Sequence, residues 1–328
     1  AGEARLEVVN RFERQPLRLR LEALLTAAAY GAPEARVLAG FADPAAFGER
    51  RAAPGVRAEF GRDPEPVRPD LSGVCFRAVN TGAEPAGAWS VVERRFSPPA
   101  DVEGREALGF WVHGDGSGAV LNIQLRNALH VSTVCFDRCL PLDFTGWRYC
   151  ELVEADTDHH ARYAWPYRFQ NSLMEFPSDP DELEALVGSS RHLYRAPYHV
   201  FGASLDPKQV ESLGLWLNNV PAGGETACRL SPLKALPLLR VPVREPRVTL
   251  GGRSLVFPVT LEPGQYLEAF SAEDCALYRM SGERIGRVQP RGEWPDLDAG
   301  PNAIELVSAP RAGEPASRLR ATVFAEGA

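Results

Sequence analysis

The sequence is poor in lysine and has no long apolar run, and each shortage excludes a class of protein. Only Lys208 and Lys234 are lysines, and 36 Lys and Arg residues stand against 43 Asp and Glu residues, giving a net charge of −7. No basic tract is present that would bind a phosphate backbone, so nucleic acid is not expected as a partner. No run of about 18 apolar residues occurs, so no membrane-spanning helix is predicted.

Cysteine and the common catalytic motifs are also scarce. Six cysteines among 328 residues are too few for a disulfide scaffold, although one or two bridges remain open, and their spacing suggests no zinc site. The sequence has no HExxH, CxxC or Walker loop, and GASLD at 202–206 lacks the second glycine of a nucleophile elbow. These absences favour a non-catalytic protein.

Glycine and proline, in contrast, are abundant. They make up 57 of the 328 residues, above the usual share of about 12%. Apolar and polar residues alternate at 17–22, 147–153 and 210–218, the period typical of strands. One short helix is predicted at 179–188, where Asp179 caps, Pro180 follows and Gly188 ends it. The chain is therefore predicted to be all-β.

A proline-rich break at 232–246 predicts a domain boundary. We expect a jelly-roll β-sandwich at 36–240 and a smaller, immunoglobulin-like β-sandwich at 241–328, which opens with a hairpin around Gly251 and Gly252. Residues 1–35 are expected to be an extension or the remnant of a preceding domain. The chain starts at Ala1 without an initiator methionine or signal segment, which suggests a mature product or a piece of a longer protein.

The most specific signal lies in three blocks of the middle region. These are GFWVHGDGSGAVLNIQLRN at 109–127, LDFTGWRYCELVE at 142–154 and VESLGLWLNNVPAGGETACRLSPLKAL at 210–236. Together they resemble the galactose-binding-like jelly-roll carbohydrate-binding modules of bacterial glycoside hydrolases. The insert at 156–198 exceeds what a minimal module of that family needs.

The resemblance implies non-catalytic recognition of a polysaccharide or oligosaccharide. The chain would then form accessory domains of a larger secreted or surface-attached bacterial protein, with a covalently linked catalytic domain as a partner. Two alternatives stay open: a jelly-roll polysaccharide lyase or glycoside hydrolase, and a structural sandwich that spaces or oligomerises an assembly.

Aromatic residues of the insert are candidates for the sugar-binding surface. Tyr163, Trp165, Tyr167 and Phe169 alternate strictly and would share one face of a strand. Sugar C–H groups stack on such rings, and Arg162 and Arg168 lie beside them to reach hydroxyl groups. Filling a sandwich core is the competing explanation of the same stripe.

A second candidate group is RHLYRAPYHVF at 191–201. It contains Tyr198 and His199, and a tyrosine with a histidine is the pair that jelly-roll polysaccharide lyases use to abstract a proton beside a uronate. The adjacent His159 and His160 would point to opposite faces of a strand, so a shared metal is not expected.

Two further expectations concern the turn residues and the tryptophans. The glycines of HGDGSG at 113–118 precede a strand rather than a helix, so a tight hairpin turn is preferred over a phosphate cradle. Jelly-roll modules often hold a structural calcium ion, so the resemblance leaves a calcium site open. Asp43, Asp115 or Asp158 would be its candidate ligands, whereas Trp89, Trp111, Trp147 and Trp216 are expected to be core residues.

Overall fold

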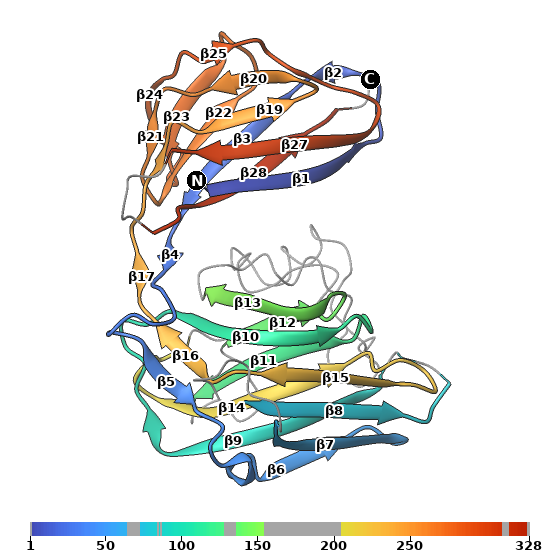
Figure 1. Cartoon of the computed structure of the whole chain (residues 1–328). Coiled ribbons are helices and arrows are strands. Elements are labelled where there is room, and N and C mark those ends of the chain that lie inside the picture. Colours follow the sequence, from blue (N-terminus) through green and yellow to red (C-terminus); the bar gives the residue numbers. More distant parts are fainter. Residues whose placement is uncertain are drawn as a thin grey trace, which may run out of the picture. The chain divides into compact units, whose positions relative to one another are not determined.

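The computed structural model folds into two units built almost entirely of strands (Figure 1). The middle unit comprises residues 30–237, and the split unit combines residues 1–29 with 238–328. The all-β prediction is confirmed, and the described part contains no helix that could cross a membrane. The structure describes residues 2–63, 73–83, 85, 87–127, 136–153, 205–309 and 315–326, and the predicted helix at 179–188 lies outside them.

The middle unit is a sandwich of two antiparallel sheets. Figure 1 shows strands of the larger sheet side by side at the front. Its seven strands are β5 (Arg36–Ala39), β16 (Leu233–Leu236), β10 (Ala107–Asp115), β15 (Glu225–Leu230), β8 (Val74–Asn80), β7 (Val56–Arg62) and β13 (Thr145–Val153), which pairs with the free edge of β10. The five-stranded sheet has the order β12 (Phe136–Pro141), β11 (Val120–Asn127), β14 (Val210–Asn218), β9 (Trp89–Ala100) and β6 (Glu49–Ala52). A 3-10 turn, η1 (Pro44–Ala46), precedes β6.

Alternate residues of these strands fill the core between the two sheets. On β10, Phe110 and Val112 are fully buried, and on β14 Leu213 and Leu215 are equally inaccessible. Successive side chains of a strand point to opposite faces, so the residues between these positions lie on the outer faces of the sheets. The alternation at 210–218 that predicted a strand therefore coincides with β14 itself.

The glycine-rich turn at 113–118 connects two sheets instead of two paired strands. β10 belongs to the seven-stranded sheet and β11 to the five-stranded sheet, so the predicted hairpin is wrong, while the predicted strand after the glycines is confirmed. Gly116 and Gly118 have φ of +76°, which glycine adopts without strain. Asp115 holds the turn, because its carboxylate accepts from Ser117 N at 3.0 Å and Ala227 N at 2.7 Å. Burial opposes its ionisation, but hydrogen bonds from Ser117, Ala227 and Thr226 outweigh that effect and lower its pKa.

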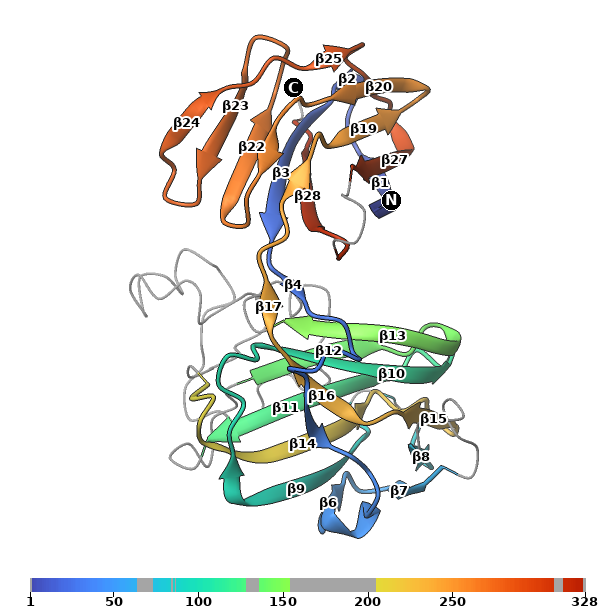
Figure 2. The same cartoon turned by 60° about the vertical axis from the view of Figure 1, so that its left-hand side comes forward.

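The split unit is a second sandwich, of two five-stranded sheets. Figure 2 shows β22, β23 and β24 of one sheet side by side. One sheet runs β1 (Gly2–Asn10), β27 (Gly300–Ser308), β19 (Arg247–Leu250), β20 (Arg253–Val256) and β25 (Arg291–Gly292), and the other runs β24 (Arg284–Arg287), β23 (Cys275–Arg279), β22 (Gln265–Ala269), β3 (Arg18–Leu24) and β28 (Arg318–Phe324). Short two-stranded pairs complete it: β2 (Gln15–Pro16) with β26 (Asp296–Leu297), β4 (Thr26–Ala27) with β17 (Leu238–Leu239), and β18 (Val243–Arg244) with β21 (Thr260–Leu261).

The predicted hairpin between β19 and β20 is present. Leu250 pairs with Arg253, and Gly251 and Gly252 between them have φ of +58° and +78°. Positive φ at both central residues is the geometry of the mirror-image turn that joins twisted strands. The immunoglobulin-like topology of this unit stays a prediction.

Residues 1–35 are not a separate extension, and this is a correction of the sequence-based division. β1 pairs along its nine residues with β27, and β3 lies between β22 and β28 in the other sheet. Leu17, Leu19 and Leu21 are buried in the core of the split unit. The N-terminal strands complete both sheets of this sandwich, a pairing over nearly the whole chain length that composition cannot reveal.

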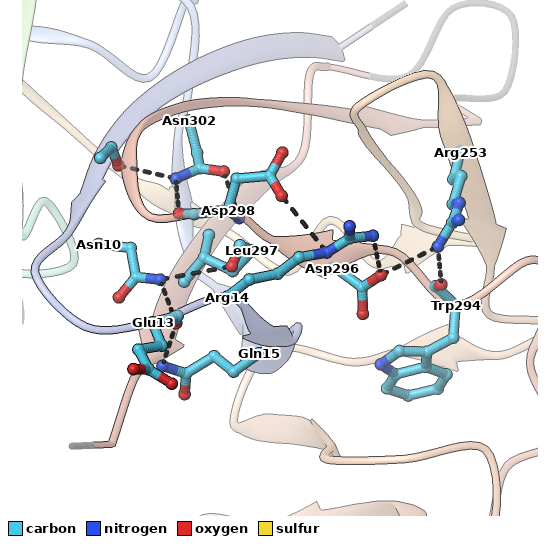
Figure 3. A network of polar contacts seen from close by, with 11 residues as sticks. Asn10, Glu13, Arg14, Gln15, Arg253, Trp294, Asp296, Leu297, Asp298 and Asn302 are labelled. Carbon is cyan, nitrogen blue, oxygen red and sulfur yellow. Dashed lines mark hydrogen bonds and ion pairs between the residues drawn. The ribbon is translucent and has the colours of Figure 1, made fainter. Parts of the chain in front are cut away.

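Polar contacts add to this N-terminal pairing (Figure 3). Arg14 donates to Asp296 at 2.6 Å and forms an ion pair with Asp298 at 3.4 Å, while Arg253 reaches the same Asp296 carboxylate at 3.2 Å. The hydrogen bond from Arg14 holds the pKa of Asp296 below its ordinary value. Asn10 Nδ2 also donates to the carbonyl oxygen of Leu297 at 3.3 Å.

Candidate functional site

The residues singled out from the sequence as a sugar-binding or catalytic surface lie outside the described part of the chain. They belong to residues 154–204, and so do His159, His160 and Asp158. These assignments therefore stay predictions. They are Arg162, Tyr163, Trp165, Tyr167, Arg168, Tyr198 and His199.

The tryptophans expected in the core have a different place. Trp111, Trp147 and Trp216 are half-buried, and they alternate with the buried residues of β10, β13 and β14. These three tryptophans therefore lie on the outer faces of the sheets, and the prediction that they fill the core is wrong. Trp89 is also half-buried; it packs against the core, and its ring centroid lies 5.2 Å from that of Trp216. The period of a strand shows which residues share a face, but it does not show which of the two faces is the core.

Five ring side chains gather on the outer face of the seven-stranded sheet, and we call this group the aromatic face: Tyr30, Trp111, His113, Trp147 and Tyr149. In the register of β10 and β13, Trp111 lies opposite Tyr149 and His113 opposite Trp147. Both pairs have ring centroids 5.3 Å apart. The ring centroids of Tyr30 and Tyr149 lie 6.1 Å apart in an edge-to-face arrangement. Four of the rings therefore come from the paired strands β10 and β13, and the fifth comes from the segment before β5.

Cationic groups flank both ends of the aromatic face. The Arg229 guanidinium lies 5.3 Å from the centre of the Trp147 ring, and its Nε pairs with Asp63 Oδ2 at 2.5 Å. At the other end, Lys234 Nζ lies 4.2 Å from the centre of the Tyr30 ring and donates to the Tyr30 carbonyl oxygen at 3.0 Å. These contacts hold the rings and place donors at the rim of the face.

Local sequence explains why the rings lie where they do. Trp111 exchanges two hydrogen bonds with Ser231, whose Oγ accepts from Trp111 N at 2.8 Å and whose N donates to Trp111 O at 2.9 Å. Gly109 has no side chain, and a Cβ there would be 2.7 Å from Tyr149 Oη. The Tyr149 ring therefore lies across the strand where glycine leaves room for it.

The Tyr149 hydroxyl is a buried polar group of this face. Its oxygen is buried and has no hydrogen-bond partner among the residues that the structure describes. Burial, reinforced by the charge of Glu151, raises the pKa of Tyr149. The phenol is therefore neutral at every physiological pH.

Metal binding has no support in the described residues. No group of three or more His, Cys, Asp or Glu side chains in that part of the chain is arranged to hold a metal ion. The Asp115 carboxylate is occupied by Ser117 and Ala227, and Asp43 accepts from Ala45 N at 3.0 Å as the cap of η1. The third candidate ligand for calcium, Asp158, is outside the described residues.

Comparisons with known proteins give structural neighbours but no sequence relatives. No protein-family model and no curated protein sequence matches this chain. A carbohydrate-binding module of the β-sandwich superfamily has a TM-score of 0.36 and 9% identity over 62% of this chain, and the match spans 61% of that module's chain.

Two further solved structures illustrate the same group. The family 11 carbohydrate-binding module of the cellulase Lic26A-Cel5E of Clostridium thermocellum has a TM-score of 0.36 and 10% identity, covering 64% of this chain and 96% of that one. Arabinose-bound MgGH51 α-L-arabinofuranosidase has a TM-score of 0.34 and 12% identity, covering 71% and 31%. Carbohydrate-binding modules and a glycoside hydrolase are therefore among the solved structures that are similar to this chain.

Proposed function

We propose that the middle unit binds a polysaccharide, without cleaving it, through the aromatic face on β10 and β13. The observation that carries this proposal is the cluster of half-buried rings held on one outer sheet face, with 5.3 Å between the members of each cross-strand pair. Apolar rings of this size normally fill a core, and here they lie on the face opposite the core.

Sugar chemistry fits this surface. The C–H groups of a pyranose ring pack on the faces of Trp111 and Trp147, and burying part of each indole contributes about 25 cal/mol per Å² of apolar area. His113 and Arg229 carry N–H groups at the same face, within reach of hydroxyls on the same sugar. Specificity then depends on the few polar groups and affinity on the rings.

The same proposal includes the larger protein to which this unit belongs. We infer that the chain serves as an accessory region of a larger carbohydrate-active protein outside the cell or at its surface. The stripe of Tyr163, Trp165 and Tyr167 would extend the binding surface, with Arg162 and Arg168 as hydrogen-bond donors. A catalytic role for Tyr198 and His199 is the alternative that the same experiment tests.

The test is a binding screen with tryptophan variants. Soluble β-glucan, xylan, arabinan and galactan are titrated into the full chain, its Trp111→Ala variant and its Trp216→Ala variant, while new reducing ends and unsaturated uronate absorbance are monitored. Trp216 is the matched control, because it is a half-buried tryptophan on the outer face of the other sheet. We expect Trp111→Ala to weaken binding about tenfold or more and Trp216→Ala to leave it unchanged.

Three results would contradict the proposal. Binding that survives Trp111→Ala but is lost in Trp165→Ala would move the site to the insert. Product formation would overturn the non-catalytic role. An absence of binding to all of these polysaccharides, in protein shown to be folded by its cooperative unfolding, would remove the proposal itself.

A further inference from the structure

A pocket of about 230 Å³ opens between β5 and the second half of β9 in the middle unit. Two arginines, Arg36 and Arg94, line it together with an apolar wall. The wall comprises Val37, Phe96, Pro98 and Pro99. None of these residues belongs to the aromatic face, so the pocket is a separate feature.

Both arginines lie on the strand faces that carry core residues, Arg94 half-buried and Arg36 exposed. Arg94 on β9 pairs with Leu213 of β14, and Arg36 on β5 pairs with Ala235 of β16. Leu213 and Ala235 are fully buried core residues. Residues directly opposite each other on paired strands share a face, so each sheet contributes one arginine to the lining of this pocket.

Neither guanidinium has a carboxylate partner in the described part of the chain. Arg36 donates to the carbonyl oxygen of Asp101, and Arg94 lies 5.1 Å from the centre of the Phe96 ring.

Two carboxylates on the loop after β9 have other contacts. Asp101 accepts from Glu103 N at 2.9 Å, and Glu103 pairs with Lys208 at 2.9 Å. Two positive charges in one pocket repel each other, and an anion that binds both removes that repulsion.

We propose that this pocket binds the carboxylate of one acidic sugar unit. Arginine pairs with carboxylates through parallel N–H···O bonds, which accounts for the charged half of the site. Phe96, Pro98 and Pro99 present the apolar surface on which the C–H groups of a sugar ring pack. A volume of about 230 Å³ is below the ~300 Å³ at which pockets for larger ligands begin, so one ring enters and a longer chain extends into solvent.

The experiment compares three small ligands by isothermal titration or NMR shift mapping on the full chain. Galacturonate carries the carboxylate and the ring, galactose carries the ring alone, and acetate carries the carboxylate alone. We expect saturable binding of galacturonate, at least tenfold weaker binding of the other two, and weakening by salt. Arg94→Gln and Arg36→Gln should each reduce galacturonate affinity about tenfold or more.

The matched control is Arg95→Gln. Arg95 is the next residue on β9, lies on the opposite face and pairs with Glu49 at 2.7 Å, so its removal should not change galacturonate affinity. Trp111→Ala should also retain galacturonate binding, which separates this site from the aromatic face. If Arg94→Gln fails to fold, Arg36→Gln decides the question, because Arg36 is exposed.

The possible contradictions are distinct. Equal affinity for galactose would show that the carboxylate is not recognised, and equal affinity for acetate would show that the sugar ring is not. Galacturonate binding that is unchanged in both arginine variants, or absent at millimolar concentration in the wild type, would overturn the site. None of these results bears on polysaccharide binding at the aromatic face.

Discussion

Replacing Tyr149 by phenylalanine should stabilise the protein, although the substitution removes a polar atom from the candidate binding face. The hydroxyl oxygen is buried, and no described residue forms a hydrogen bond with it, so folding removes its contacts with water without a replacing hydrogen bond from that part of the chain. The ring itself keeps its contacts with Trp111 at 5.3 Å and Tyr30 at 6.1 Å in the variant. Only the unsatisfied oxygen is lost.

The magnitude follows from the cost of a buried unsatisfied group. Leaving such a hydroxyl unpaired costs about 1–3 kcal/mol, and the substitution removes this cost. The small cavity left by the missing oxygen destabilises the variant and offsets part of the gain. We expect the free energy of unfolding to rise by about 1 kcal/mol. Tyr30→Phe is the control of opposite sign, because the Tyr30 hydroxyl donates to the Pro232 carbonyl at 2.8 Å and its loss should cost about 0.5–1.5 kcal/mol.

The assay is denaturant unfolding of the wild type and both variants at neutral pH, followed by tryptophan fluorescence. A Tyr149→Phe variant that is less stable than the wild type by more than about 0.5 kcal/mol would show that the hydroxyl has a partner, and would refute the reasoning.

Alkaline pH gives a second readout of the same hydroxyl. Burial raises the pKa of Tyr149 above that of an unfolded tyrosine, which is about 10. Above pH 10 the unfolded chain loses a proton that the folded chain keeps, so the free energy of unfolding decreases as pH rises. Tyr149→Phe should make this decrease shallower.

Three further predictions concern the rest of the fold. Gly114→Ala should destabilise the protein by about 1–3 kcal/mol in thermal unfolding, because the new Cβ would overlap the Phe144 carbonyl oxygen, and wild-type stability would contradict the packing of that turn. In native protein, Cys75 should react with a thiol reagent faster than Cys228, whose burial raises its pKa and blocks access, and equal rates measured by mass spectrometry would contradict this. Deleting residues 1–29 should abolish cooperative unfolding of the split unit, and an intact transition would contradict their place in its sheets.

Local patterns predicted the strands well, because the period of a strand and the residue types of a turn are properties of adjacent residues. The alternation at 210–218 became β14, and Gly251 and Gly252 formed the expected turn because both need positive φ. The position of residues 1–29 could not be predicted in this way. Asn10 and Leu297 are in hydrogen-bond contact although 287 residues separate them, and no local signal encodes such a pairing.

The candidate site was missed for a related reason. Trp111 and His113 alternate on one strand, and Trp147 and Tyr149 alternate on another, so the sequence holds the signal that each pair shares a face. Which face is the core depends on sheet pairing: only the register that puts Trp111 opposite Tyr149 shows that the two pairs meet. The pocket lined by the two arginines could not be predicted for the same reason, because β5 and β9 belong to different sheets.

The most direct test of carbohydrate recognition at the aromatic face is the affinity of Trp111→Ala and Trp216→Ala for the polysaccharide that binds the wild type most tightly. The two variants remove the same side chain from the outer faces of the two sheets of one sandwich. We predict a loss of about tenfold or more for Trp111→Ala and none for Trp216→Ala. Equal losses in both variants, or none in either, would contradict the assignment.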